Sequence, residues 1–260
     1  MSFVFDSYVG IDYSGAETAE SSLKNLRVYE ATTSRGASEV QPPTGPKKYW
    51  TRSGIARWLT QKLNKEETTL VGVDHGFSFP LQYFEKYDLR HDWDTFLDDF
   101  QKHWPTDKAE TYVCFVQEGV CGNAAARCGS PRWRRITEVR ARAKSVFHFH
   151  VPGSVAHSTH AGIPWLRYVR ERTRERVHFW PFDGWSIPEG KSVVAEVYPA
   201  LWNHSFAKQE RTSDQHDAYA VAEYFRQSGR DGGLVRLFEP RLEPEERRHA
   251  QIEGWILGVL

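Results

Sequence analysis

Two short stretches, Val9-Gly10-Ile11-Asp12 and Val71-Gly72-Val73-Asp74, follow one plan: apolar residues around a glycine, ended by an aspartate. They belong to segments 7–13 and 69–74, whose β-branched and aromatic residues, followed by turn residues, predict strands. In an open α/β sheet, ligands bind at the carboxyl ends of strands beside a topological switch. We therefore expect Asp12 and Asp74 to lie at one functional edge of a sheet.

Further elements are expected on both sides of these strands. Residues 26–33 predict a strand, residues 34–48 a polar loop, and Thr51 the cap of a helix with apolar residues on one face. A third buried strand is expected at 192–199, with the carboxylate of Glu196 near its end. A last helix is expected to begin near Ser213 and Asp214 and to continue to Arg226.

Asp217 belongs to the apolar face of that last helix. It lies one turn before Val221 and two turns before Phe225, so it projects along the face that should pack on the sheet. A carboxylate in that position needs a partner or a metal ion.

The middle of the chain, residues 81–189, predicts an elaboration inserted into one domain that spans residues 1–260. The core would then comprise about residues 5–80 and 190–260, with the insertion between the fourth and fifth core strands. Within the insertion we expect an acidic amphipathic stretch around Phe96 and Phe100, a strand at 111–117, an arginine-rich segment at 132–144 and a helix at 165–176. The closing residues, 250–260, predict another packed helix.

Composition is typical of a globular protein. Of 260 residues, 40% are hydrophobic and 26% charged, and 34 Lys and Arg balance 34 Asp and Glu, which argues against disorder and against a uniformly basic surface. The charge is uneven, because residues 127–176 hold 12 Lys or Arg against 3 Asp or Glu, a local excess of +9. With no apolar run of about 18 residues and no signal-like start, we expect no membrane contact and a cytoplasmic protein.

The carboxylates form a candidate metal site. Asp12, Asp74, Asp214 and Asp217 come from three distant elements that the predicted topology brings to one edge of the sheet. Converging carboxylates repel one another unless cations bind, and hard oxygen ligands suit Mg²⁺ or Mn²⁺. Simpler interpretations stay open: Asp214 and Asp217 can be a helix cap and a favourable charge at the helix dipole, and Asp12 or Asp74 alone can be a turn former.

The order of these motifs resembles the RNase H-like nuclease superfamily. The helix start Asp214-x-x-Asp217-Ala is similar to that of RuvC-type Holliday-junction resolvases. More narrowly, five motifs resemble a domain-of-unknown-function family of predicted RNase H-like nucleases: Gly10-Ile-Asp12, Gly72-Val-Asp74-His-Gly-Phe-Ser-Phe-Pro80, Trp180-Pro-Phe-Asp-Gly-Trp185, Glu196-Val-Tyr-Pro199 and Asp217-Ala-Tyr-Ala.

This resemblance implies an α/β fold, an RNase H-like mixed sheet flanked by helices, and divalent-metal hydrolysis of nucleic-acid phosphodiester bonds. Asp12 would bridge metal ions from the first strand, Asp74 would act from the fourth, and Asp214 and Asp217 would complete the site. Many superfamily nucleases have a glutamate where Asp74 stands. Glu196 is a fifth candidate, as a ligand or as a neighbour of the ligands. The sequence does not indicate whether the substrate is DNA or RNA, or whether cleavage is endonucleolytic or exonucleolytic. It does not indicate the oligomeric state either.

Arginines and histidines supply secondary candidates. Arg167, Arg170 and Arg174 would share one helix face, and together with Arg132, Arg134 and Arg135 they could bind nucleic-acid phosphates. The alternative is a solvated face paired with Glu171 and Glu175. The two remaining candidates are His75 and His216. Each adjoins a proposed metal ligand in sequence and could orient a water or donate to a phosphate.

Two other functions stay open. One is a non-catalytic nucleic-acid-binding or scaffold protein on the same fold. The other is an actin-like ATPase or sugar kinase, because residues 9–15 resemble the first phosphate loop of those folds, although no second Gly-rich loop follows a hairpin.

Overall fold

The computed structural model describes residues 5–260, and in them the chain forms a six-stranded mixed sheet with the order β3-β2-β1-β4-β6-β5. The parallel part comprises β1, β4, β6 and β5, while β2 is antiparallel to β1 and β3 to β2. The strands are β1 (Ser7–Asp12), β2 (Arg27–Thr32), β3 (Ser38–Glu39), β4 (Thr69–Asp74), β5 (Val177–Trp180) and β6 (Ser192–Glu196). The expected α/β class with a mixed sheet is confirmed.

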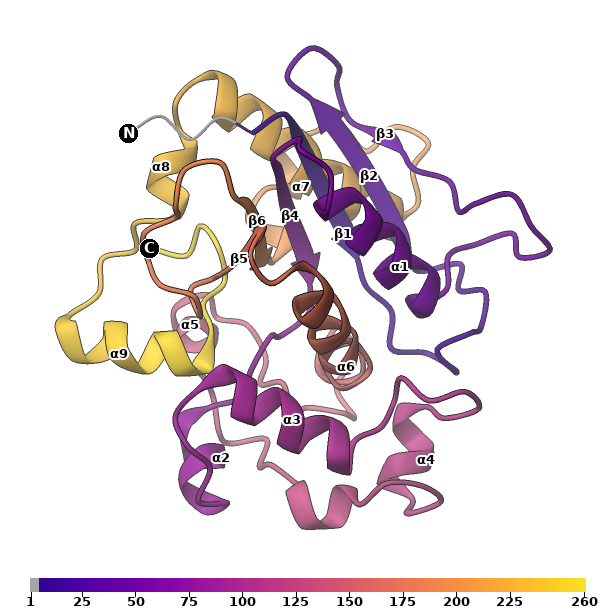
Figure 1. Cartoon of the computed structure of the whole chain (residues 1–260), viewed down its shortest axis with the longest axis vertical. Helices are drawn as coiled ribbons and strands as arrows, with labels where there is room; N and C mark the ends of the chain where they lie inside the picture. The colour runs from indigo at the N-terminus through magenta and orange to yellow at the C-terminus, as the bar shows by residue number, and fades with distance from the viewer. Residues whose placement is uncertain (1–4) are drawn as a thin grey trace.

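Helices cover both faces of the sheet. Figure 1 shows α1 and α7 on opposite sides of it, and α2, α3 and α4 gathered beyond the arrowhead of β4. The helices are α1 (Arg52–Leu63), α2 (Leu81–Lys86), α3 (Trp93–His103), α4 (Val113–Gln117), α5 (Ile136–Arg140), α6 (Ala156–Thr173), α7 (Ser213–Arg230), α8 (Leu234–Leu237) and α9 (Pro244–Glu253). The expected long insertion after β4 is therefore present, and it is helical.

Two glycines let α7 lie directly on the sheet. Gly10 and Gly72 are register partners on the neighbouring strands β1 and β4, and we call this pair the glycine seam. A Cβ atom on Gly10 would lie 2.2 Å from the carbonyl oxygen of Ala218, and one on Gly72 would lie 2.8 Å from Cγ1 of Val221. Because no side chain fits between them, the backbone of α7 rests against the backbone of β1.

The direction of α7 follows from its contacts with β1. Its late residue Gly229 packs against the hydroxyl of Tyr8, while its early residue Ala218 packs on Gly10. The helix therefore runs opposite to β1, and its first turns extend toward the carboxyl end of that strand. Side chains alternate along a strand, so Tyr8, Gly10 and Asp12 all face this helix.

The other face of the sheet carries the larger apolar core. Val9, Ile11, Val71 and Val73 belong to a cluster of buried side chains that includes residues of α1 and α6. No helix within residues 5–260 is long and apolar enough to cross a membrane.

Several expected elements differ from the structure. The range expected as an insertion, 81–189, includes a strand of the central sheet, because β5 pairs in parallel with β6. The loop expected at 34–48 contains the short strand β3. The strand expected at 111–117 is wrong, because Val113 and Val116 are both buried on one side of the short helix α4. The helix expected at 165–176 begins earlier, at Ala156, and ends at Thr173.

The helix expected at 250–260 is also wrong. The last helix, α9, ends at Glu253, because Gly254 and Gly258 adopt positive φ angles of 80° and 86°, which are incompatible with a continuing α-helix. Between them, Ile256 forms an isolated parallel bridge with Glu196 beside the end of β6.

The glycine seam makes a testable prediction. We expect Gly10→Ala to lower the free energy of unfolding by about 3 kcal/mol, because the new methyl group must displace helix backbone. Gly45→Ala is the matched control, since its Cβ meets only an atom 3.8 Å away in an exposed loop; a change within about 0.5 kcal/mol is expected there. Urea denaturation of both variants measures the difference, and equal stabilities would contradict the direct packing.

Candidate functional site

The structure brings two predicted carboxylates together. Asp12 and Asp74 end the parallel strands β1 and β4 as register partners, and their side chains share a hydrogen bond. Asp214 and Asp217 lie in the first turns of α7, which the glycine seam positions over the same edge. Both act on Asp12 as neighbouring negative charges. We call these four side chains the acidic edge.

Burial and mutual repulsion shift the pKa values of the acidic edge upward. Burial, followed by the charges of Asp74, Asp214 and Asp217, raises the pKa of Asp12 well above its usual value. Burial, followed by the charges of Asp217 and Glu196, raises the pKa of Asp74 to about 8. Burial raises the pKa of Asp214 against the opposing effect of Arg27. Without a bound cation, the Asp12–Asp74 pair therefore retains a proton at neutral pH.

The acidic edge lacks counter-charges of its own. Within residues 5–260, none of its four carboxylates forms an ion pair, and Arg27, the cation that acts on Asp214, is bound to Glu39 at 2.8 Å. In the same part of the chain, no group of three or more His, Cys, Asp or Glu side chains is arranged so that it could hold a metal ion. The donor set is nevertheless composed of hard oxygens that repel one another, which suits Mg²⁺ or Mn²⁺.

Asn203 is a residue of this site that the sequence did not indicate. Its Nδ2 donates a hydrogen bond of 2.8 Å to Oδ1 of Asp217, and its backbone oxygen lies 3.0 Å from Nε2 of His216. It belongs to a 3₁₀ turn, η3 (Asn203–Ser205), that follows β6. Asn203 therefore fixes one oxygen of Asp217 and, with it, the first turns of α7.

The residue that caps the start of α7 is Thr212, and not Asp214 or Asp217. The side chain of Thr212 caps α7 by accepting from the backbone N–H of Gln215, and the side chain of Gln215 accepts from the N–H of Thr212 in return. Because Thr212 occupies the cap, Asp214 and Asp217 lie within the first turns, where their charges still favour the helix dipole.

Glu196, the fifth candidate, is engaged elsewhere. Its two oxygens accept hydrogen bonds of 2.6 and 2.7 Å from the guanidinium of Arg135, and Oε2 also accepts from the backbone N–H of Phe77. The side chain is buried. Because its charge and its lone pairs are satisfied, we leave Glu196 out of the proposed metal ligands.

The predicted phosphate-binding arginines of segment 132–144 separate into different roles. Arg135 is 1% exposed and binds Glu138 and Glu196, so it is removed from the predicted nucleic-acid surface. Arg134 donates to the carbonyl oxygens of Glu138 and Ala143 and thereby stabilises the end of α5. Arg132 is exposed and stays a candidate for phosphate contact.

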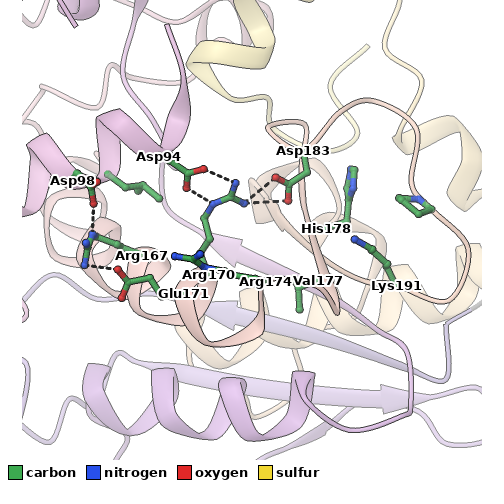
Figure 2. Close-up of a pocket in the computed structure, with 12 residues that line it drawn as sticks. Asp94, Asp98, Arg167, Arg170, Glu171, Arg174, Val177, His178, Asp183 and Lys191 are labelled. Carbon is green, nitrogen blue, oxygen red and sulfur yellow. Dashed lines mark hydrogen bonds and ion pairs between the residues drawn. The ribbon is translucent and has the colours of Figure 1, made fainter. Parts of the chain in front are cut away.

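The arginines of α6 are mostly paired with acidic side chains (Figure 2). Arg167 binds Asp98 and Glu171, and Arg170 binds both Asp94 and Asp183. These ion pairs line a cavity of about 610 Å³ beside β5. The Arg167–Glu171 pair matches the interpretation of a paired helix face, whereas Arg174 is exposed.

The two histidines adjoin the acidic edge in sequence but differ in surroundings. His75 is 1% exposed on the opposite face of the sheet from Asp74, where burial lowers its pKa to about 4. Its Nδ1 lies 2.9 Å from the carbonyl oxygen of Gly76, and its ring contacts Tyr13 and Phe77. The ring of His216 contacts the backbone oxygen of Asn203, the residue whose side-chain amide binds Asp217.

The segment that resembles a first phosphate loop is closed by the insertion. Gly15 is buried, and a Cβ on it would lie 2.1 Å from the carbonyl oxygen of His157 at the start of α6. Backbone of α6 therefore occupies the space next to Gly15.

Comparison with known proteins adds no identification. No protein-family model matches the chain, and no curated protein or solved structure is significantly similar to it. The resemblance to RNase H-like nucleases therefore stays a prediction based on the motifs.

The raised pKa of Asp74 predicts a pH-dependent stability. Because the pKa of Asp74 is raised to about 8 and that of Asp12 is also raised, the folded pair keeps a proton that the unfolded chain releases near pH 4, at the usual pKa of about 3.9. Stability is therefore lost as pH rises through that window. In EDTA at pH 8, we expect Asp74→Asn to raise the melting temperature by about 3–6 °C, for a gain of about 1–2 kcal/mol. At pH 4 the two proteins should melt nearly together. A wild type that becomes more stable between pH 5 and 8 relative to the variant would contradict this account.

Proposed function

We propose that this protein is a Mg²⁺- or Mn²⁺-dependent nuclease that hydrolyses nucleic-acid phosphodiester bonds. The observation that carries the proposal is the pairing of Asp12 with Asp74 at the ends of two parallel strands, with Asp214 and Asp217 beside them and without an ion pair within residues 5–260. Carboxylates that share a proton in this way provide a site for a divalent cation in its place.

Each residue has a defined role in this proposal. Asp12 and Asp74 would hold the metal directly, and Asp217 and Asp214 would complete its surroundings from α7. When bound, a divalent cation supplies Lewis-acid activation of a water and charge stabilisation at phosphorus. Asn203 keeps Asp217 oriented through its amide, and its other contact, with His216, ties the same turn to the end of β6.

The order of elements supports the RNase H-like interpretation. The chain has a strand ending in Asp12, two antiparallel strands, helix α1, a strand ending in Asp74 and, after β6, helix α7 with Asp214-x-x-Asp217 in its first turns. This is the order on which the resemblance rests. The edge strand β5 and the helical segment before it are elaborations beyond that shared order. The proposal for the reaction rests on the carboxylates and not on the fold.

A cleavage assay with matched variants tests the proposal. Purified protein is incubated with labelled single-stranded, duplex and branched DNA and RNA in Mg²⁺, Mn²⁺ or EDTA. We expect metal-dependent cleavage that falls at least about 100-fold in Asp12→Asn and in Asp74→Asn, since even loss of a group that only supports a metal ligand costs about 10–100-fold. Asp231→Asn, an exposed change at the far end of α7, should leave the rate unchanged.

Calorimetric titration with Mn²⁺ separates the proposal from its alternative. Wild-type protein should bind the ion, and the double variant Asp12→Asn plus Asp217→Asn should not. Cleavage that survives in Asp12→Asn would contradict the site. A wild type that binds nucleic acid but neither binds Mn²⁺ nor cleaves would favour the non-catalytic binding protein.

The contact of Asn203 with Asp217 makes a separate prediction. Asn203→Ala removes the amide that fixes Oδ1 of Asp217 while keeping the backbone oxygen that contacts His216. We expect cleavage activity or Mn²⁺ affinity to fall about 10–100-fold, as for other groups that orient a metal ligand. Unchanged Mn²⁺ affinity together with unchanged cleavage would show that this orientation is unimportant.

A further inference from the structure

A small cavity of about 110 Å³ adjoins the acidic edge on the side of the insertion. Asp74 contributes to its wall, together with Tyr198 after β6 and the residues that follow α5, Arg142 and Lys144. The cavity thus connects a carboxylate of the proposed metal pair with the positively charged segment 127–176.

The charged side chains around this cavity differ in how they are engaged. Arg135 is bound by Glu138 and Glu196, so these three side chains together carry a net charge of −1. Lys144 donates from Nζ to the carbonyl oxygen of Pro152, which is not a charged partner. The guanidinium of Arg142, in contrast, makes no hydrogen bond or ion pair within residues 5–260, and the residue is exposed. Its five N–H donors are available to a ligand.

The backbone conformation at Arg142 suits glycine better than arginine. α5 ends in a Schellman motif, in which the N–H of Arg142 donates to the oxygen of Val139 and the N–H of Ala143 donates to the oxygen of Glu138. Arg142 has a φ of 53° there. Glycine adopts this conformation without steric cost and is the usual residue at this position, whereas arginine is not.

We propose that this cavity binds a phosphate group of the nucleic-acid backbone, held by Arg142 next to Asp74. This inference rests on the proposed nuclease function and assigns the substrate a position in it. A guanidinium binds phosphate oxygens in a bidentate manner. A cavity of about 110 Å³ has room for a phosphate group. Because DNA and RNA share the phosphate group, both would make this contact with Arg142.

Arg142→Gly tests the proposal without straining the fold. The substitution removes the guanidinium, and glycine adopts the positive φ of this position without steric cost. Binding of fluorescein-labelled DNA and RNA oligonucleotides of one sequence is measured by anisotropy in Ca²⁺ at several salt concentrations. We expect the Kd to rise about tenfold for both nucleic acids. We also expect the slope of log K against log salt concentration to become smaller in magnitude by about one phosphate contact. The urea midpoint should be unchanged or higher, and Arg142→Lys should retain part of the affinity.

Two control variants separate the site from general effects. Gln209→Gly relaxes another left-handed residue, with a φ of 51°, and Arg230→Gln removes an exposed positive charge at the far end of α7. Both should bind like wild type. An Arg142→Gly protein that is stably folded and binds with wild-type affinity and salt slope would overturn the proposal, as would equal losses in Arg230→Gln.

The outcomes also distinguish this inference from the nuclease proposal. If wild type cleaves and Arg142→Gly binds and cleaves equally well, the phosphate site is wrong and the nuclease proposal stands. If wild type binds nucleic acid through Arg142 but does not cleave in any metal, the phosphate site stands and the nuclease proposal is wrong. A wild type that binds no nucleic acid overturns both.

Discussion

The close packing of α7 on the glycine seam is the constraint on which the site depends. With Gly10 and Gly72 side by side, the helix approaches until its backbone touches the sheet, and its direction then sets its first turns over the ends of β1 and β4. A side chain at either glycine would lift or tilt the helix. Asp217 would then move away from Asp12, because both are carried on rigid elements that meet at this seam.

The insertion is joined to the core through a buried ion-pair network centred on Arg135. This guanidinium contacts Glu138 of α5, Glu196 of β6 and the backbone of Glu253 at the end of α9. It satisfies the hydrogen-bonding capacity of Glu196, whose charge nevertheless contributes to the raised pKa of Asp74. The same network holds the residues after α5 beside the cavity that Asp74 also lines, which is why a segment far away in the sequence lies close to the proposed metal site.

Local patterns in the sequence predicted the parts of the fold that depend on local chemistry. The strands that end in Asp12 and Asp74, helix α1 and the start of α7 are marked by periodicity and caps, and they lie where expected. β5 was missed because Val177–Trp180 directly follows an arginine-rich helix and is defined by its pairing with β6, which is non-local. The glycines that end α9 show in the same way that a few apolar residues near a terminus do not suffice to predict a helix.

The candidate site shows the same division. The carboxylates that lie together were visible as strand-end and helix-start residues, but Asn203 carries no recognisable pattern around it. Whether an arginine is free or paired depends on partners far away in the chain: 61 residues separate Arg135 from Glu196, and 76 separate Arg170 from Asp94. The basic segment therefore predicted an excess of charge but not which of its residues could bind a phosphate.

The most direct test of the central claim is the position of a bound metal. Crystals grown or soaked in Mn²⁺ and measured for anomalous scattering should show a peak within coordination distance of both Asp12 and Asp74, with Asp217 facing it from α7. A peak at another site, or an Asp12–Asp74 pair that stays metal-free in saturating Mn²⁺, would contradict the account.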